Sequence, residues 1–364
     1  MMQTLAVEGY RSISSLVLGL ERLTVVTGAN GTGKSNLYRS LQLLADCGQG
    51  RMISSLARSG GLGSVRFAGE GPQPSPVSLR LGFASDSIGY AIDIGLPQVG
   101  DSMFRHDPEI KQEHIFAGDV LRPATTLLER RRGLVKADGV RLQQNMPAWQ
   151  SVLDEQAGNE SVPEAGAVRR ELRSWRFHDA FRTDANAPAR RPQVATRSFR
   201  LDDDGANLAA VLQTTIENGG EAEIALAAVH HAFKGSTLEI QGDASGLVAG
   251  LRQSGLARVM TAGELSDGTL QFLLLVAALT SVESPGLLVL NEPERSLHSS
   301  LMPALARLIT QTSERTQTIV VTHHADLTRL LGGASVELRK SAARTTVAGR
   351  EGRLDQPVWA WPKR

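Results

Sequence analysis

One short stretch near the N-terminus constrains the fold more than any other part of the sequence. It matches the pattern G-x-x-x-x-G-K-[ST] and consists of Gly28, Ala29, Asn30, Gly31, Thr32, Gly33, Lys34 and Ser35. The apolar run Leu23 to Val26 precedes it, and leucines at helical spacing follow it between Ser35 and Ala45. A glycine-rich loop between a strand and a helix is the arrangement that wraps around phosphate groups.

The residue types in this loop suit a nucleoside triphosphate with its metal ion. The glycines let successive backbone N–H groups turn toward the phosphates, and the start of the next helix adds its positive end. We expect Lys34 to reach the β- and γ-phosphates and the Ser35 hydroxyl to ligate Mg²⁺. ATP and Mg²⁺ are therefore the expected cofactors, with Asn36 completing the nucleotide-binding residues. The alternative, a chance glycine turn before a helix, is disfavoured by the full match in context.

Two apolar runs in the second half of the chain each end in polar residues. Leu287 to Leu290 leads into Asn291 and Glu292, and Thr318 to Val321 leads into a pair of histidines, of which the first is His323. Such runs suit parallel strands buried on both faces, whose carboxyl ends face the ligand crevice. There, Glu292 can position a water and accept its proton, and His323 can hydrogen-bond the γ-phosphate. The alternatives are a surface glutamate and a structural histidine.

Residues 264–269, Glu-Leu-Ser-Asp-Gly-Thr, precede an almost wholly apolar helical stretch. Ser266 or Asp267 is expected to cap this helix, and Gly268 permits close approach of another backbone. A helix start with a free hydroxyl and exposed amides also suits a γ-phosphate presented by another subunit. The capping interpretation holds whether or not the functional one does.

Composition gives no global signal for nucleic acid or membrane, because 39 Lys and Arg nearly balance 38 Asp and Glu. The single cysteine, Cys47, rules out an internal disulfide framework and fits a reducing compartment. The most apolar stretch, Leu270 to Leu279, is far shorter than the ~20 residues that a bilayer requires. With no secretory pattern at the N-terminus, a cytoplasmic protein without a membrane partner is expected.

The region from Leu121 to Arg200 is the one with a marked charge asymmetry, since it holds fifteen Lys and Arg against nine Asp and Glu, a net charge of +6. Such a surface can follow the phosphate backbone of DNA. The alternative is a solvated surface in an arginine-rich sequence. The aromatic residues of this region fit a helical core better than base-stacking platforms; they are Trp149, Trp175, Phe177 and Phe181.

Taken together, these motifs resemble the ABC ATPase superfamily, specifically its RecF/SMC-like branch of AAA-annotated cytoplasmic ATPases. The resemblance rests on GANGTGKSN (28–36), ELSDGT (264–269), LLVLNEPERSLH (287–298) and VVTHH (320–324). The opening LAVEGYRSISSLVLGLERLTVVTG (5–28) is also typical of that branch. The resemblance covers the ATPase head, about residues 1–100 and 205–340 of this chain.

The resemblance implies a role for each motif. Residues 28–35 would be the Walker A loop, and residues 287–292 the Walker B strand with Glu292 as the general base. His323 would be the switch histidine, and residues 296–298 the D-loop at a dimer interface. Residues 265–269, LSDGT rather than LSGGQ, would be the signature motif, which in these families closes on the ATP of the opposite protomer through Ser266 and Gly268.

The sequence departs from the family pattern at two places. Asn291 stands where most members have an aspartate that supports the Mg²⁺ shell, which should weaken metal binding and slow turnover. An amide at Asn291 can still hold a metal-bound water. No glutamine stands out as the Q-loop residue, for which Gln112 is a candidate.

The expected fold is α/β: a P-loop NTPase head of the ABC type, with an antiparallel β subdomain and a basic, mostly helical insertion. We predict the Walker A lobe with the β subdomain at 1–100, the insertion at 101–204, the signature, Walker B and switch-histidine lobe at 205–340, and a C-terminal strand and tail at 341–364.

The leading functional hypothesis is an ATPase that dimerises around two ATP molecules and drives a conformational switch. Family members often serve DNA repair or phage defence, so DNA or a separate effector protein is the expected further partner. One alternative is an ATP-dependent binding or scaffold module with little hydrolysis. A transporter nucleotide-binding subunit is a weaker alternative, because the opening, the LSDGT motif and the basic insertion all argue against it.

Overall fold

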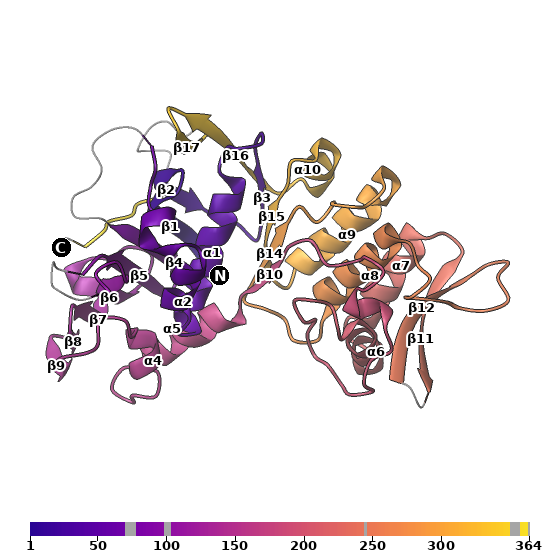
Figure 1. Ribbon diagram of the computed structural model, residues 1–364, viewed down its shortest axis with the longest axis horizontal. Helices are drawn as coiled ribbons and strands as arrows, with labels where there is room; N and C mark the ends of the chain where they lie inside the picture. The colour runs from indigo at the N-terminus through magenta and orange to yellow at the C-terminus, as the bar shows by residue number, and fades with distance from the viewer. Residues whose placement is uncertain (70–77, 98–102, 244–245, 350–356, 363–364) are drawn as a thin grey trace. The chain divides into compact units, whose positions relative to one another are not determined.

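The computed structural model describes residues 1–69, 78–97, 103–243, 246–349 and 357–362. The chain divides into two compact units. Unit 1 comprises Met1–Glu21, Val26–Trp175 and Val336–Arg364, and unit 2 comprises Arg22–Val25 and Arg176–Ser335. Figure 1 labels the helices and strands of both units.

Unit 1 is built on an antiparallel sheet of eight strands in the order β2-β1-β4-β5-β6-β7-β8-β9. The strands are β1 (Met2–Tyr10), β2 (Ile13–Gly19), β4 (Leu79–Ser85), β5 (Ile88–Gly95), β6 (Glu109–Ala117), β7 (Thr126–Arg131), β8 (Leu134–Ala137) and β9 (Val140–Gln143). Strands β4 and β5 form an antiparallel hairpin around residues 85–87, in which Phe83 pairs with Tyr90.

Helices cover one face of this sheet in unit 1. They are α1 (Lys34–Gly48), α2 (Met52–Arg58), α3 (Gly61–Val65), α4 (Val152–Glu155) and α5 (Pro163–Ser174), with the 3-10 turn η1 (Pro123–Thr125) in a connection. Helix α1 packs against α5 so closely that a Cβ at Gly48 would lie 2.5 Å from the Cβ of Leu172. Trp175, at the end of α5, stacks edge-on against Phe83 of β4, with ring centroids 5.4 Å apart.

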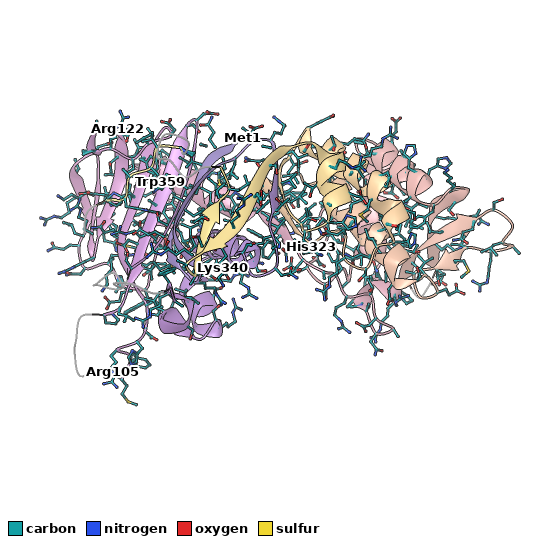
Figure 2. The ribbon with its side chains drawn as sticks, turned by 90° about the horizontal axis from the view of Figure 1, so that it is seen from above. Met1, Arg105, Arg122, His323, Lys340 and Trp359 are labelled. Carbon is teal, nitrogen blue, oxygen red and sulfur yellow. The ribbon has the colours of Figure 1, made fainter. Side chains whose placement is uncertain are left out.

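The opposite face of the same sheet is covered by the C-terminal tail. Ala84, Ala91 and Phe116 form a small buried cluster there, against which Trp359 and Trp361 pack. Trp359 is labelled over these strands in Figure 2. Neighbouring residues of β4, Phe83 and Ala84, thus face opposite sides, as the period of a strand requires.

Unit 2 contains parallel strands surrounded by helices. Strand β14 (Leu287–Asn291) pairs with β10 (Arg176–His178) on one side and β15 (Gln317–Val321) on the other, and β3 (Leu23–Thr27) lies next to β15. Helix α8 (Asp267–Thr280) is buried at every position from Leu270 onward. Its all-round burial explains why its sequence is apolar without a polar stripe.

The remaining strands of unit 1 lie near the glycine-rich loop of residues 28–35. The remaining helices and strands of unit 2 complete its core. In unit 2 they are η2 (Pro188–Arg190), α6 (Leu208–Asn218), α7 (Ala222–Ala232), the sheet β11 (Ser236–Asp243), β12 (Gly246–Gln253) and β13 (Met260–Thr261), η3 (Ser299–Leu301), α9 (Met302–Ser313) and α10 (Ala325–Leu331). Near the C-terminus, β16 (Ala334–Ser341) and β17 (Arg344–Val347) form an antiparallel pair.

The mixed α/β architecture is confirmed, but the region 101–204 differs from the expected helical insertion. Its first part contributes four strands, β6 to β9, to the sheet of unit 1, and α4 and α5 are its only α-helices in the described residues. The boundary between the units falls between Trp175 and Arg176, inside this range. Some charged residues of β6 and β7 are buried as pairs and so occupy positions where a strand pattern would show an apolar residue. The sequence therefore did not predict these strands.

Candidate functional site

The glycine-rich loop of residues 28–35 has the backbone conformation that its sequence predicts. Gly28, Gly31 and Gly33 have φ angles of +148°, +80° and +109°, which side chains with a Cβ rarely adopt. A Cβ at Gly28 would lie 2.5 Å from the carbonyl oxygen of Leu338. The tip of the loop, at Ala29 and Asn30, is exposed.

Lys34 and Ser35 begin helix α1 directly after this loop. The Lys34 Nζ donates to the carbonyl oxygens of Gly28 at 2.6 Å and Ala29 at 3.2 Å, so its charge lies within the loop. The Ser35 side chain is exposed at the first turn of the helix. A cation and a hydroxyl in these positions suit a polyphosphate and its metal ion.

Side chains from other parts of unit 1 hydrogen-bond the loop and the start of α1. Thr345 of β17 donates through Oγ1 to the Thr32 carbonyl at 2.8 Å and lies 2.7 Å from the Ser12 Oγ. Asn36 donates to the same Ser12 Oγ at 2.7 Å. Asn36, predicted as a nucleotide contact, thus uses its amide nitrogen to brace the loop. The sequence did not indicate Thr345, since it lies more than three hundred residues from its partner Ser12.

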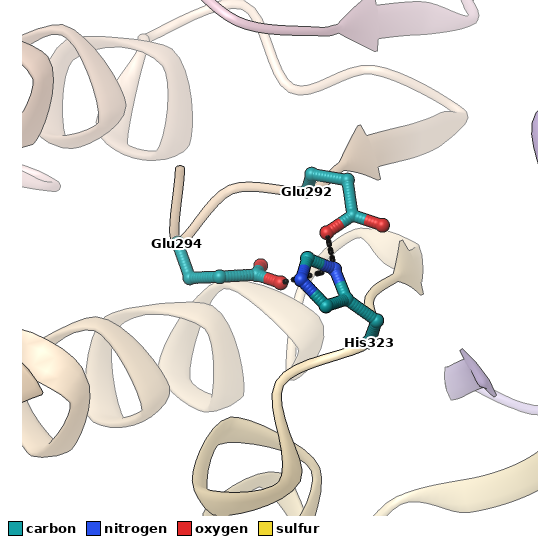
Figure 3. Close-up of side chains that lie close together, drawn as sticks. All are labelled: Glu292, Glu294 and His323. Carbon is teal, nitrogen blue, oxygen red and sulfur yellow. Dashed lines mark hydrogen bonds and ion pairs between the residues drawn. The ribbon is translucent and has the colours of Figure 1, made fainter. Parts of the chain in front are cut away.

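In unit 2 the ends of β14 and β15 bring Glu292 and His323 together. The Nδ1 of His323 hydrogen-bonds Oε2 of Glu292 (Figure 3), and because a carboxylate only accepts, Nδ1 is the donor. Glu292 adopts a left-handed φ of +49°, and its backbone N–H donates to the Val321 carbonyl at 2.7 Å. A non-glycine residue with positive φ is uncommon and is found at functional sites.

Glu294 is a third member of this cluster that sequence reasoning did not include. Its side chain is 5% exposed; Oε1 accepts a 2.5 Å hydrogen bond from Thr322 and lies 3.7 Å from Nδ1 of His323 (Figure 3). Burial raises the pKa of Glu294 to about 7, against the lowering effect of the Thr322 hydrogen bond. Its position two residues after Glu292, in a loop that turns sharply, could have suggested it.

Asn291 ends β14 and is bonded to a carboxylate from the neighbouring strand. The parallel register pairs His178 with Leu290, which places the next residues, Asp179 and Asn291, side by side. Asn291 Nδ2 donates to Asp179 Oδ1 at 3.1 Å. The acidic group that the sequence lacks at position 291 is therefore present one strand away. Asp179 directly follows β10 (Arg176–His178), and its sequence alone does not indicate that it lies beside Asn291.

The start of helix α8 has the predicted capped form. Ser266 is the N-cap, and its Oγ accepts from the Thr269 N–H at 3.3 Å. A Cβ at Gly268 would lie 2.8 Å from the carbonyl oxygen of Ser296, so glycine is needed for the approach of these two segments. Ser266 itself is exposed.

The predicted site residues thus form three local groups. The phosphate loop lies in unit 1, whereas Asn291, Glu292 and His323 form one group in unit 2 and Ser266 with Gly268 forms another. Gln112 is buried within β6 of the eight-stranded sheet, paired in register with Asp93 and Arg131.

The basic region is less free than its net charge suggests. Trp175 and Phe181 are buried, as expected for a core, whereas Trp149 is 68% exposed. The Arg130 side chain is completely buried against Glu113 of the same unit. Among the described residues, no helix has the length and apolar character to cross a membrane.

Comparison with known proteins agrees with these features. A family model described as "AAA domain, putative AbiEii toxin, Type IV TA system" matches residues 23–328. None of the curated proteins searched matches the sequence. The SMC head domain from Thermotoga maritima is similar in structure, with 14% identity, a TM-score of 0.53, and coverage of 96% of this chain and 99% of that chain.

A second similar structure is an Smc head bound to the C-winged helix domain of ScpA. It has 14% identity, a TM-score of 0.55, and coverage of 95% of this chain and 97% of that chain. At such identities the likeness shows the fold alone, which is the SMC-like head fold that the sequence motifs led us to expect. The chain belongs to the AAA-domain family whose model it matches, as a P-loop ATPase related in fold to SMC heads.

Proposed function

We propose that the protein binds ATP with Mg²⁺, that two copies close around two ATP molecules, and that hydrolysis opens them again. The observation that carries this proposal is the hydrogen-bonded pair Glu292 and His323 at the carboxyl ends of β14 and β15. In parallel α/β sheets, ligands bind at this edge. A base next to a histidine that can contact phosphate is what water attack on a γ-phosphate requires.

Each group has a distinct part in the proposed reaction. Lys34 and the loop amides hold the phosphates, and Glu292 accepts a proton from the attacking water. With both ring nitrogens protonated, His323 would donate to Glu292 through Nδ1 and to a phosphate oxygen through Nε2, since its side chain is 59% exposed. Ser266 and the exposed start of α8 are proposed to meet the γ-phosphate held by a second copy.

Ser35 and Asn291 are proposed to hold Mg²⁺, which takes oxygen ligands and keeps several waters. Ser35 offers an exposed hydroxyl, and Asn291 offers its amide oxygen because its nitrogen is bonded to Asp179. The Asp179 carboxylate adds the negative charge that Asn291 lacks. Bound Mg²⁺ would neutralise charge on the β- and γ-phosphates.

The decisive experiment uses Glu292→Gln. We expect this variant to bind ATP normally, to lose at least about 100-fold in turnover, and to accumulate as a dimer in ATP and Mg²⁺ but not in ADP. Light scattering after size exclusion measures the dimer. Glu239→Gln is the matched control, because Glu239 lies in β11 and its ion-pair partner is the exposed Arg252; it should leave turnover unchanged.

Lys34→Ala separates binding from chemistry in the same assays. It removes the cation that lies within the loop, so ATP should no longer bind measurably in calorimetry. Normal ATP affinity in Lys34→Ala would refute the loop assignment. A strictly monomeric Glu292→Gln would refute the ATP-closed dimer.

A second candidate is an ATP-dependent binding module with little hydrolysis. Asn291 favours it, since an amide in place of a carboxylate weakens the interaction with a hard cation. Steady-state turnover of the unmodified protein in Mg²⁺ distinguishes the two: ATP-dependent dimers without turnover would favour the module. Asn291→Asp should then tighten Mg²⁺ affinity and not reduce activity.

The object of the proposed switch is either DNA or a separate effector protein. The exposed Arg141 supports DNA, whereas the ion pair of Arg197 with Glu217 and the burial of Arg130 subtract from the charge available for it. Anisotropy of a labelled duplex, with and without ATP, tests the DNA arm. Salt-insensitive or absent binding would leave the effector protein as the partner class.

A further inference from the structure

One arginine of the basic region, Arg190, points into the protein and hydrogen-bonds the loop before helix α8. It ends the short turn η2, and its side chain is only 10% exposed. Its guanidinium contacts two segments of unit 2: residues 183–184 of its own connection and residues 262–267 of the loop that ends at Ser266. This set of contacts is not used by the function proposed above.

On the loop side, Nη1 donates to the carbonyl oxygens of Ala262 at 3.0 Å and Leu265 at 2.7 Å, and more weakly to Gly263 at 3.5 Å. Nη2 donates to Oδ1 of Asp267 at 2.7 Å. A planar guanidinium presents its donors in a fixed fork. The positions of these acceptors are therefore tied to one another through a single side chain.

On its own side, the guanidinium is held by the chain that precedes it. Nε donates to the carbonyl oxygens of Thr183 at 2.9 Å and Asp184 at 3.1 Å, and Nη2 donates to Thr183 at 2.8 Å. The connection is also fixed beyond Arg190. Gln193 exchanges backbone hydrogen bonds with Leu247 of β12, at 2.9 and 2.7 Å. Arg190 is thus mounted on a segment that is itself anchored.

Charge gives the contact with Asp267 a second consequence. Asp267 is the first residue of α8, adjacent to the N-cap Ser266, and its side chain is 63% exposed. An unpaired carboxylate at this place would repel any phosphate that approaches the helix start, since like charges a few ångströms apart interact unfavourably. The 2.7 Å ion pair with Arg190 offsets that charge while leaving the Ser266 hydroxyl exposed.

We propose that Arg190 is the positioning residue of this loop: it sets the conformation of residues 262–267 and cancels the charge of Asp267, so that the start of α8 accepts the terminal phosphate of a nucleotide held by a second copy. The inference rests on the proposed ATP-closed dimer for its partner. The hold of Arg190 on the loop is independent of dimerisation.

The test measures dimer formation in the Glu292→Gln background, where hydrolysis does not interfere. Arg190→Gln should leave ATP affinity of the monomer unchanged but raise the dimer dissociation constant by roughly tenfold or more. Adding Asp267→Asn to Arg190→Gln should recover part of this loss, because it removes the uncompensated charge. Arg190→Lys keeps the positive charge but not the forked donor geometry. Its dimer dissociation constant should therefore lie between that of the Glu292→Gln protein and that of the same protein carrying Arg190→Gln.

Arg182→Gln is the matched control, since Arg182 lies on the same connection but is 59% exposed and pairs only with Asp184; it should dimerise normally. Amide exchange of residues 262–269 in monomers provides a readout that needs no dimer, and Arg190→Gln should accelerate it. Unchanged exchange together with unchanged dimerisation would overturn the proposal. If Glu292→Gln alone stays monomeric in ATP, the proposed dimer and this role toward a partner both fail, and accelerated exchange would still establish the grip on the loop.

Discussion

Unit 1 buries charge in the middle of its sheet, whereas unit 2 keeps its centre apolar and carries charge at the ends of its strands. In unit 1, Arg130 of β7 and Glu113 of β6 are fully buried and 3.0 Å apart. In unit 2, helix α8 and its neighbours form one continuous apolar cluster. The difference shows which parts of the fold can be predicted from the sequence and which cannot.

The buried pair of unit 1 is satisfied on every side. Glu113 accepts from the Tyr90 hydroxyl at 2.8 Å, the Ser151 hydroxyl at 2.5 Å and the Val152 N–H at 3.0 Å. Arg130 donates to the carbonyl oxygens of Arg132 at 2.7 Å and Pro147 at 2.8 Å. Breaking such a pair costs more than forming it gains, because the remaining charge is left without a partner in a low-dielectric interior.

Removing one member of the pair is therefore expected to have the largest effect on stability. Arg130→Met should lower the free energy of unfolding of unit 1 by about 3–5 kcal/mol, since Glu113 would keep a buried charge without its cation. All four tryptophans, Trp149, Trp175, Trp359 and Trp361, lie in unit 1, so their fluorescence during urea unfolding reports on that unit.

The control for this prediction is an exposed pair of unit 2. Arg252 of β12 and Glu239 of β11 lie 2.7 Å apart with side chains 49% and 35% exposed. Arg252→Met should change stability by no more than about 1 kcal/mol, measured by circular dichroism. Equal losses in the two variants would show that burial does not distinguish the pairs.

The same contrast explains what the sequence could reveal. Long apolar runs predicted α8, β14 and β15 of unit 2, because polar residues within them, such as Gln271 of α8, are few. Strands β6 and β7 went unrecognised, since Glu113 and Arg130 sit at positions where an apolar residue would have marked the buried face. Their burial depends on each other, and no local pattern displays that pairing.

The candidate site divides in the same way. The phosphate loop, Glu292, His323 and Ser266 follow from motifs with fixed spacing, so they could be named from the sequence. Asp179 could not, because its relation to Asn291 arises from the register of two strands more than one hundred residues apart. Arg190 likewise depends on a tertiary contact, which composition presented only as surplus positive charge.

The pH dependence of stability should be the next largest effect, and both units contribute to it. Burial lowers the pKa of His114 in unit 1 and of His178 in unit 2 to about 4. Near His114, Glu129 and Asp93 raise the pKa and Arg131 lowers it; near His178, Arg176 lowers it. Each imidazole is thus neutral in the folded protein at a pH where it would be protonated in the unfolded chain.

The sign follows from proton binding. Between pH 6.5 and 4 the unfolded state binds more protons, so stability falls as the pH is lowered, by up to about 3 kcal/mol for each histidine. His114→Gln should flatten the pH profile followed by tryptophan fluorescence. His178→Gln should flatten the pH profile of stability measured by circular dichroism, but not the profile measured by tryptophan fluorescence. A profile unaffected by either change would mean that other groups control acid unfolding.

The smallest expected effect on stability comes from Ser266, and it bears on whether the proposed site is shared between copies. Its Oγ caps α8 by accepting from the Thr269 N–H at 3.3 Å and also lies 2.8 Å from the Thr269 hydroxyl. Ser266→Ala should cost about 1 kcal/mol, the usual value for losing an N-cap. Thermal unfolding followed by circular dichroism measures this loss.

Ser266→Arg turns this small structural role into a test of the arrangement. If Ser266 acts only as a cap, activity should decline in proportion to lost stability. If it meets the phosphate of a second copy, the variant should fold and bind ATP yet fail to dimerise or hydrolyse. Mixing it with Lys34→Ala leaves one complete site in a heterodimer, with Lys34 from the Ser266→Arg copy and Ser266 from the Lys34→Ala copy. We expect a fraction of the unmodified ATPase activity to return on mixing. The complete site takes Lys34 from one chain and Ser266 from the other. If a demonstrated heterodimer recovers no ATPase activity, this would count against independent sites shared between two chains.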